Sequence, residues 1–181
     1  IYEHFGITPQ QVLDRGIIPL VMTTFSKFAA SAGAAISSHR REMIDLLDVS
    51  PTSIGTISLP PPSTAAALES IRQLRQNPQL VKTLQANAHY LRSLLIEHNF
   101  DVIGETNVLP VILPQNLSPK VFARHLMEKH SVWVSAIWFI AKPRLRITAN
   151  ALHTQDEMEQ LVEAMVKTRD TLYQPAAVAT A

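Results

Sequence analysis

Lys27 is the residue whose neighbours best suit covalent chemistry. It follows an apolar run at residues 17–25, and the hydroxyl residues Thr24 and Ser26 stand beside it. An amine at the end of a buried strand loses part of its hydration, which favours the neutral, nucleophilic form needed for Schiff-base chemistry. Neighbouring hydroxyls can also hold phosphate oxygens. On spacing alone a solvated surface lysine is the commoner reading, so both readings stay open.

Two arginines form a second candidate site. Arg144 and Arg146 stand two positions apart in residues 144–148 (RLRIT), whose alternation predicts a strand with one polar face. Both guanidinium groups then point to the same face, and each presents the fork that matches a carboxylate. An exposed strand face with ordinary surface ion pairs is the alternative.

Hydroxyl side chains gather in an irregular stretch before three prolines and form a third candidate. Such a cluster suits phosphate binding, although hydroxyls in loops more often satisfy the turn backbone. The members are Thr52, Ser53, Thr56 and Ser58.

Composition excludes several other kinds of chemistry. The 181 residues contain no cysteine, so disulfides, thiolate metal sites and a cysteine nucleophile are ruled out. The seven histidines show no metal-ligand spacing, and the five glycines form no phosphate-binding loop motif. With 16 basic and 15 acidic residues the formal net charge is +1, which gives no drive toward nucleic acid. We therefore expect no metal, no nucleic-acid partner and no transmembrane segment.

The first part of the chain predicts a strand-containing segment followed by helices. The apolar run at 17–25 favours a strand covered on both faces, although the chain supplies no obvious neighbours for it. A short turn of helix is expected at 10–13. Ser63 or Thr64 is the expected cap of a helix over 65–77, and Pro78 opens a long helix that ends near 98–99. The remaining expectations here are a strand at 34–37 and a helix at 40–47.

The second part of the chain predicts a mixed α and β lobe. Thr154, followed three residues later by Glu157, forms a capping box that opens the last helix. A further helix is expected from Ser118 through Glu128. The expected strands are 100–103, 108–113, 132–134 and 144–148.

Five stretches in order resemble the α-oxoamine synthase family of pyridoxal-phosphate (PLP) enzymes. They are EHFGI (3–7), VMTTFSKFAASAGAAI (21–36), TISLPPPSTAAAL (56–68), LPVIL (109–113) and RLRITANALHT (144–154). The resemblance covers nearly the whole chain but only the C-terminal half or so of a family member. It implies an α/β fold, the C-terminal part of a fold-type I PLP-dependent transferase. Residues 1–62 would be a fragment of the cofactor-binding large domain, 63–99 a helical bridge and 100–181 the small α+β domain.

The resemblance also assigns roles to individual residues. Lys27 matches the lysine that forms a Schiff base with PLP, and Thr24 matches a threonine that contacts the cofactor. Thr56 falls where a neighbouring subunit reaches the cofactor phosphate. Arg146 matches the arginine that holds the substrate carboxylate, with Arg144 as the nearby alternative.

The implied activity is condensation of an amino acid with an acyl thioester, on coenzyme A or a carrier protein, with decarboxylation. The implied assembly is a cytoplasmic homodimer. The family's pyridine-nitrogen aspartate and ring-stacking histidine would lie before Ile1, so we expect a piece of a longer synthase that is inactive alone.

Two other readings stay open. A PLP-dependent aminotransferase of the same fold is one, and a non-catalytic, dimerising piece is the other. The second is favoured by residues that depart from the family pattern near the lysine and in the phosphate loop: Thr23, Ala32, Ala34, Ala35 and Ile57.

Overall fold

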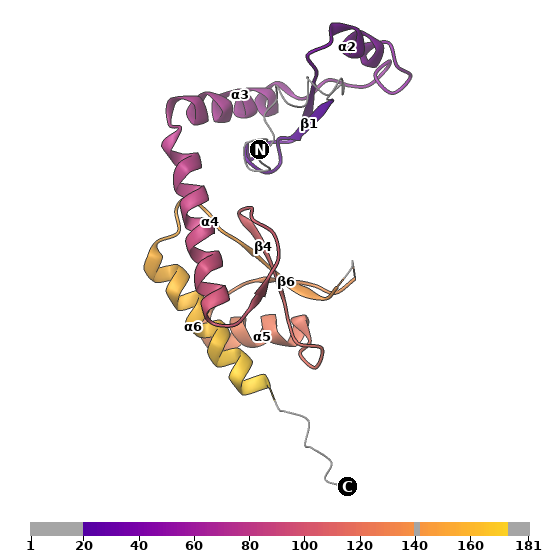
Figure 1. Cartoon of the computed structure of the whole chain (residues 1–181). Coiled ribbons are helices and arrows are strands. Elements are labelled where there is room, and N and C mark those ends of the chain that lie inside the picture. The colour runs from indigo at the N-terminus through magenta and orange to yellow at the C-terminus, as the bar shows by residue number, and fades with distance from the viewer. Residues whose placement is uncertain (1–19, 140–141, 174–181) are drawn as a thin grey trace. The chain divides into compact units, whose positions relative to one another are not determined.

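A computed structural model describes residues 20–139 and 142–173 (Figure 1). By their internal contacts the residues divide into two units, Ile1–Pro78 and Gln79–Ala181. The boundary falls within the range 63–99 expected to be a helical bridge. The EHFGI stretch and the helical turn at 10–13 lie outside the described residues.

The described residues of the first unit form a two-stranded ribbon and two helices. β1 (Val21–Thr24) pairs antiparallel with β2 (Ala34–Ser37), as the sequence predicted for 34–37. α2 (Arg41–Asp48) follows, and then α3 (Pro61–Gln76). α3 begins before the expected Ser63 or Thr64 cap, with Pro60 at the N-cap position. Prolines suit this first turn because its amide groups have no helical partner to lose.

The expectation that the first strand is covered on both faces is wrong for this unit. Met22 of β1 is 68% exposed, and all of β2 is exposed. Among the described residues of the unit, the buried apolar side chains are Ala29 and Ala67. Two alanines supply too little apolar surface to cover the ribbon.

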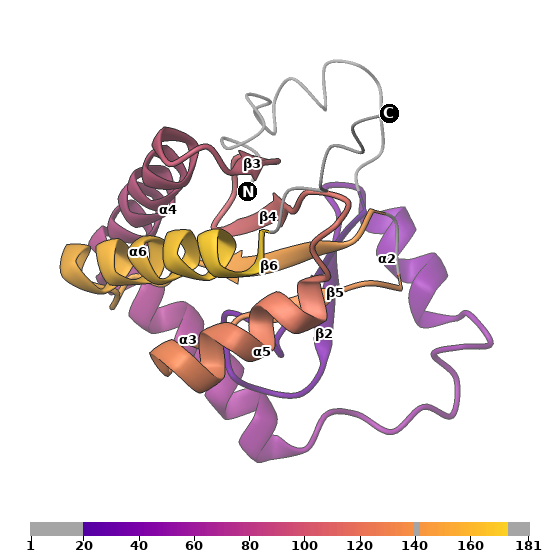
Figure 2. The same cartoon turned by 90° about the horizontal axis from the view of Figure 1, so that it is seen from below.

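In the described part of the second unit, three helices pack on a four-stranded antiparallel sheet. The strand order is β3 (Asp101–Val102), β4 (Val108–Ile112), β6 (Arg144–Thr148) and β5 (Ser135–Ile137). The helices are α4 (Gln79–Glu97), α5 (Pro119–His130) and α6 (Gln155–Leu172). In Figure 2, α6 lies across β4 and β6 with α4 and α5 on either side. Within the described ranges, no helix combines the length and apolar character needed to cross a bilayer.

The core of this unit fixes which way the sheet residues point. Leu145 and Ile147 of β6 are 0% and 4% exposed and face the helices. Because side chains alternate along a strand, Arg146 and Thr148 stand on the opposite face. Fully buried side chains from the other elements complete the core: Leu91, Leu95, Leu109, Val111, Phe122, Leu126, Met158, Val162 and Met165.

The edge strand β5 differs from the expected strand at 132–134. α5 ends with Ser131 in the left-handed region (φ 57°), and the Val132 amide donates to the Leu126 carbonyl at 3.2 Å. The chain then joins the sheet only at Ser135, opposite Arg146. Ile147 and Thr148 therefore extend past the end of β5, which leaves space at this edge.

Candidate functional site

Lys27 lies in the turn that joins β1 to β2. The turn is closed by the Phe25 amide, which donates to the Gly33 carbonyl at 2.9 Å, and by the amides of Ala29 and Ser31, which donate to the Phe25 carbonyl at 3.2 Å each. The Lys27 side chain is exposed, as the reading of a solvated surface lysine expects, and is not partly desolvated. Its Nζ donates to Ser26 Oγ at 3.2 Å. The amine is thus held on an ordered turn and stays open to an incoming group.

The Lys27 turn is anchored on α3. Ser31 Oγ donates to the Ser63 carbonyl at 2.7 Å, and Ser70 Oγ donates to the Ala29 carbonyl at 3.2 Å. Ala29 is 2% exposed and Ala67 of α3 is 3% exposed. These small residues let the turn pack tightly on the helix, as the density of Ala and Ser in this stretch allows.

The two threonines predicted as cofactor contacts occupy different places in the first unit. Thr24 is the last residue of β1 and pairs with Ala34, so it sits at the base of the Lys27 turn. Thr56 is exposed in the stretch between α2 and α3, where its Oγ1 donates to the Thr52 carbonyl at 2.5 Å. Because Thr56 Oγ1 acts as a donor here, its oxygen can still accept a hydrogen bond from another group.

Arg144 and Arg146 lie on β6, in the second unit. Arg146 is exposed on the face opposite the core. Arg144 is half-buried and its Nη1 donates to the Lys142 carbonyl at 2.9 Å. Arg146 therefore presents the more accessible guanidinium for a carboxylate.

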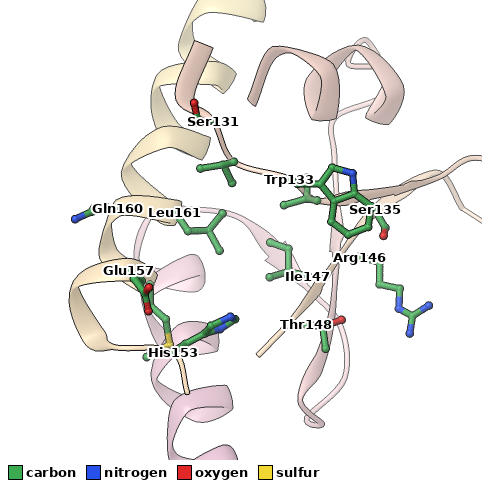
Figure 3. A pocket seen from close by; sticks show the side chains of 13 residues that line it. Ser131, Trp133, Ser135, Arg146, Ile147, Thr148, His153, Glu157, Gln160 and Leu161 are labelled. Atoms are coloured by element: carbon green, nitrogen blue, oxygen red, sulfur yellow. The ribbon is translucent and has the colours of Figure 1, made fainter. Parts of the chain in front are cut away.

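A cavity of about 530 Å³ opens where β6 extends past β5. It is bordered by residues 131–135, by the end of β6 and by the first turns of α6. Figure 3 shows the His153 ring extending across it toward Thr148, while the Arg146 guanidinium points away from His153. Its lining residues include Val132, Trp133, Val134, Arg146, Ile147, Thr148, His153, Glu157, Met158 and Leu161.

Hydrogen bonds hold the loop that carries His153. The Asn150 amide donates to His153 Nδ1 at 3.3 Å. From α4, Asn87 Nδ2 donates to the carbonyls of Asn150 and His153, each at 2.9 Å. Asn87 thus holds the backbone of the loop, and the Asn150 amide orients the imidazole.

The predicted capping box at the start of α6 is confirmed. The Thr154 amide donates to Glu157 Oε2 at 2.8 Å, and Thr154 Oγ1 donates to the same oxygen at 3.1 Å. These hydrogen bonds hold the pKa of Glu157 below its usual value, so the carboxylate is charged at neutral pH. The cavity wall beside His153 thus carries a negative charge.

The aromatic residues near the cavity are exposed and lie outside the core of the second unit. Trp133 is 76% exposed and Phe139 is 67% exposed. Trp138 is half exposed, and Lys120 Nζ lies 3.8 Å from its ring centroid.

His153, which the sequence offers as either a packing or a site-lining residue, is not among the predicted catalytic, cofactor-binding or substrate-binding residues. Its position directly before the capping box is the signal that fixes it beside the start of α6. The described residues contain no group of three or more His, Asp or Glu side chains able to hold a metal ion.

Comparisons with known proteins identify relatives over nearly the whole chain. The sequence profile of aminotransferase class I and II matches residues 1–165. Human serine palmitoyltransferase 3 is 29% identical over 185 residues, covering 95% of this chain and 32% of that protein. The 8-amino-7-oxononanoate synthase of Xylella fastidiosa strain M12 is 31% identical, covering 88% of this chain and 41% of that protein.

A solved high-resolution structure of SPT with a PLP internal aldimine superposes with a TM-score of 0.77 at 24% identity. It covers 90% of this chain and 42% of the solved one, and it shows that the two share a fold. The chain thus spans less than half the length of these relatives.

Proposed function

The chain belongs to the aminotransferase class I and II family, and from this membership we propose that it supplies the cofactor lysine and the carboxylate-binding arginine of a PLP-dependent acyltransferase. The reaction is the condensation of an amino acid with an acyl thioester. It yields an α-amino ketone, carbon dioxide and the free thiol. The observation that supports it most is the exposed Lys27 amine on an anchored turn, in a chain whose relatives are serine palmitoyltransferase and 8-amino-7-oxononanoate synthase.

The residues around Lys27 fit PLP. An aldehyde needs an accessible amine, which Lys27 provides, and a phosphate needs hydrogen-bond donors. Hydroxyls of Thr24 and Ser26 lie on the same turn or at its base. We assign Thr56 to the phosphate of the cofactor bound by a neighbouring subunit. This assignment requires a dimer, and we propose a homodimer. We expect the enzyme in the cytoplasm.

PLP, when bound, supplies an electron sink for the charge that develops at the substrate Cα. Lys27 would hold PLP through its amine. When not bound to PLP, the same amine would serve as a base for the proton on the substrate Cα. Arg146 orients the substrate by binding its carboxylate with two parallel hydrogen bonds.

Cofactor capture tests the proposal directly. PLP is added to the protein that carries this chain, followed by borohydride and peptide mass spectrometry. The expected result is a pyridoxyl group on Lys27, lost in Lys27→Ala and retained in Lys82→Ala, which alters an exposed lysine of α4. Absence of label at Lys27 in the unaltered protein would refute the role.

Product analysis separates the open alternatives. Release of carbon dioxide from a labelled amino-acid carboxyl group, dependent on an acyl thioester, marks the condensation. Amino transfer to a keto acid without that release would identify an aminotransferase. Neither product from cofactor-loaded protein would identify a non-catalytic piece.

A further inference from the structure

The cavity at the sheet edge has an apolar floor that the proposed function does not yet use. Val134, Ile147 and Met158 line it and are 8%, 4% and 1% exposed. Its volume of about 530 Å³ falls within the range of about 300–1,000 Å³ typical of small-molecule sites. A floor of aliphatic and thioether groups suits a hydrocarbon chain, which gains by leaving water.

His153 adds one directed polar group to this surface. Its Nδ1 accepts from the Asn150 amide, so in the neutral imidazole the ring proton resides on Nε2. The ring extends into the cavity toward Thr148 (Figure 3). Within the described part of the chain Nε2 has no hydrogen-bond partner, so its N–H is available to an acceptor on a ligand.

The charge on the cavity wall restricts that ligand. Glu157 lines the same cavity, and its hydrogen bonds to Thr154 keep it ionised. Arg146, the cationic lining residue, directs its guanidinium away from His153 (Figure 3). The Glu157 carboxylate would repel an anionic group beside His153, whereas an uncharged carbonyl oxygen would carry no net charge to be repelled.

We propose that this cavity binds the linear, uncharged acyl chain of the thioester substrate, and that His153 donates from Nε2 to a carbonyl oxygen of that ligand. The inference rests on the proposed function, which brings an acyl thioester to the strand that carries Arg146. It makes His153 a specificity-determining residue. It also predicts discrimination against chains that end in a carboxylate.

The test is a titration of the 181-residue chain with N-acetylcysteamine thioesters of straight-chain acids, four to ten carbons long. Methyl signals of Val134, Ile147 and Leu161 report binding by NMR. The dissociation constant is expected to fall about four-fold per added methylene until the cavity is full. His153→Ala should weaken each thioester about five-fold, the net value of a neutral hydrogen bond. His89→Ala, at an exposed histidine of α4, should leave binding unchanged.

A second arm tests the charge argument. A thioester of equal length ending in a carboxylate should bind about ten-fold more weakly. Glu157→Gln should remove this penalty while keeping α6 capped, because glutamine also completes a capping box. Equal affinity for the two thioesters in the unaltered chain, or no shift at the cavity methyls with any thioester, would overturn the inference.

Thioester binding in the cavity and PLP capture at Lys27 are tested independently of each other. Thioester binding in the cavity without PLP capture at Lys27 would refute the proposed function alone. Capture at Lys27 without thioester binding would refute this inference alone.

Discussion

Gly33 and Leu59 lie so close that no β carbon fits between them. A β carbon built on Gly33 would stand 2.4 Å from Leu59 Cδ2 and 2.6 Å from Cδ1. Gly33 also has a φ of +102° and accepts the hydrogen bond that closes the Lys27 turn. The packing of Leu59, just before α3, thus depends on a glycine at the end of that turn.

Replacing Gly33 by alanine should open the Lys27 turn. Alanine at this φ costs about 1–3 kcal/mol, and Leu59 must also move. Gly55→Ala is the matched control, because its φ is +80° but nothing lies within 4 Å of the added carbon. Hydrogen exchange of the Phe25 amide should accelerate about ten-fold or more in Gly33→Ala. Equal exchange in the two variants would show that the Leu59 contact does not matter.

Asn87→Ala should loosen the loop that carries His153. The variant loses two hydrogen bonds from α4 to this loop, worth about 1–3 kcal/mol together. Urea unfolding, followed by core methyl signals of the second unit, measures the loss. Ser93→Ala removes a hydrogen bond within α4 and should change the free energy of unfolding by less than about 0.5 kcal/mol. A loss in Asn87→Ala no larger than that of the control would contradict the loop's dependence on Asn87.

The start of α6 should be sensitive to acid through Glu157. The Thr154 amide and then its hydroxyl lower the pKa of this carboxyl from 4.5 in the folded chain. Ionised Glu157 therefore adds stability at pH values above about 4.5, and this contribution is lost as the pH falls through the lowered pKa. Thr154→Ala should raise the Glu157 pKa measured by NMR, whereas Thr154→Ser should keep it low. An unchanged pKa in Thr154→Ala would mean that the hydroxyl has no part in the shift.

Replacing a buried leucine by alanine should lower the free energy of unfolding much more than replacing an exposed one. Leu145→Ala removes a side chain that is 0% exposed and should cost about 2–5 kcal/mol. Leu152 is 81% exposed, so Leu152→Ala should lie within about 0.5 kcal/mol of the unaltered chain. Chemical unfolding of the second unit measures both. Similar losses would mean that β6 does not form the centre of this core.

Arg146 and Arg144 are distinguishable by substrate binding. In cofactor-loaded protein, Arg146→Lys should raise the KM for the amino acid about ten-fold or more, because lysine lacks the bidentate fork. Arg144→Lys should have a smaller effect, since Arg144 is half-buried and bonded to the Lys142 carbonyl. A larger effect at Arg144 would move the carboxylate contact to that residue.

Local sequence patterns predicted much of the second unit. The alternation in 144–148 gave β6 with its polar face, and Thr154 with Glu157 gave the start of α6. Both depend on residues close in sequence. The strand expected at 132–134 failed because three apolar residues do not reveal where pairing begins. The start of pairing is set by the left-handed conformation of Ser131 and by the pairing of Ser135 with Arg146. The cavity lies where β6 continues beyond this first pair.

Local sequence patterns predicted less of the first unit. The apolar run at 17–25 predicted a strand, which the structure shows at Val21–Thr24, with residues 17–19 outside the described part. It did not predict the surroundings of the strand, since cover for a strand comes from residues distant in sequence. The Schiff-base role of Lys27 likewise stays a prediction, because the amine is exposed beside Ser26 and lacks the partial desolvation that the reactive reading assumed.

The ribbon of β1 and β2 has a practical consequence for work in solution. Met22 faces Ile36 across the ribbon, and these side chains are 68% and 48% exposed. Uncovered strands with apolar cross-strand pairs adhere to one another edge to edge, and an isolated two-stranded ribbon holds its shape poorly. Self-association of this ribbon will grow with protein concentration, so each titration on the chain calls for a dilution series to separate ligand effects from clustering of the protein itself.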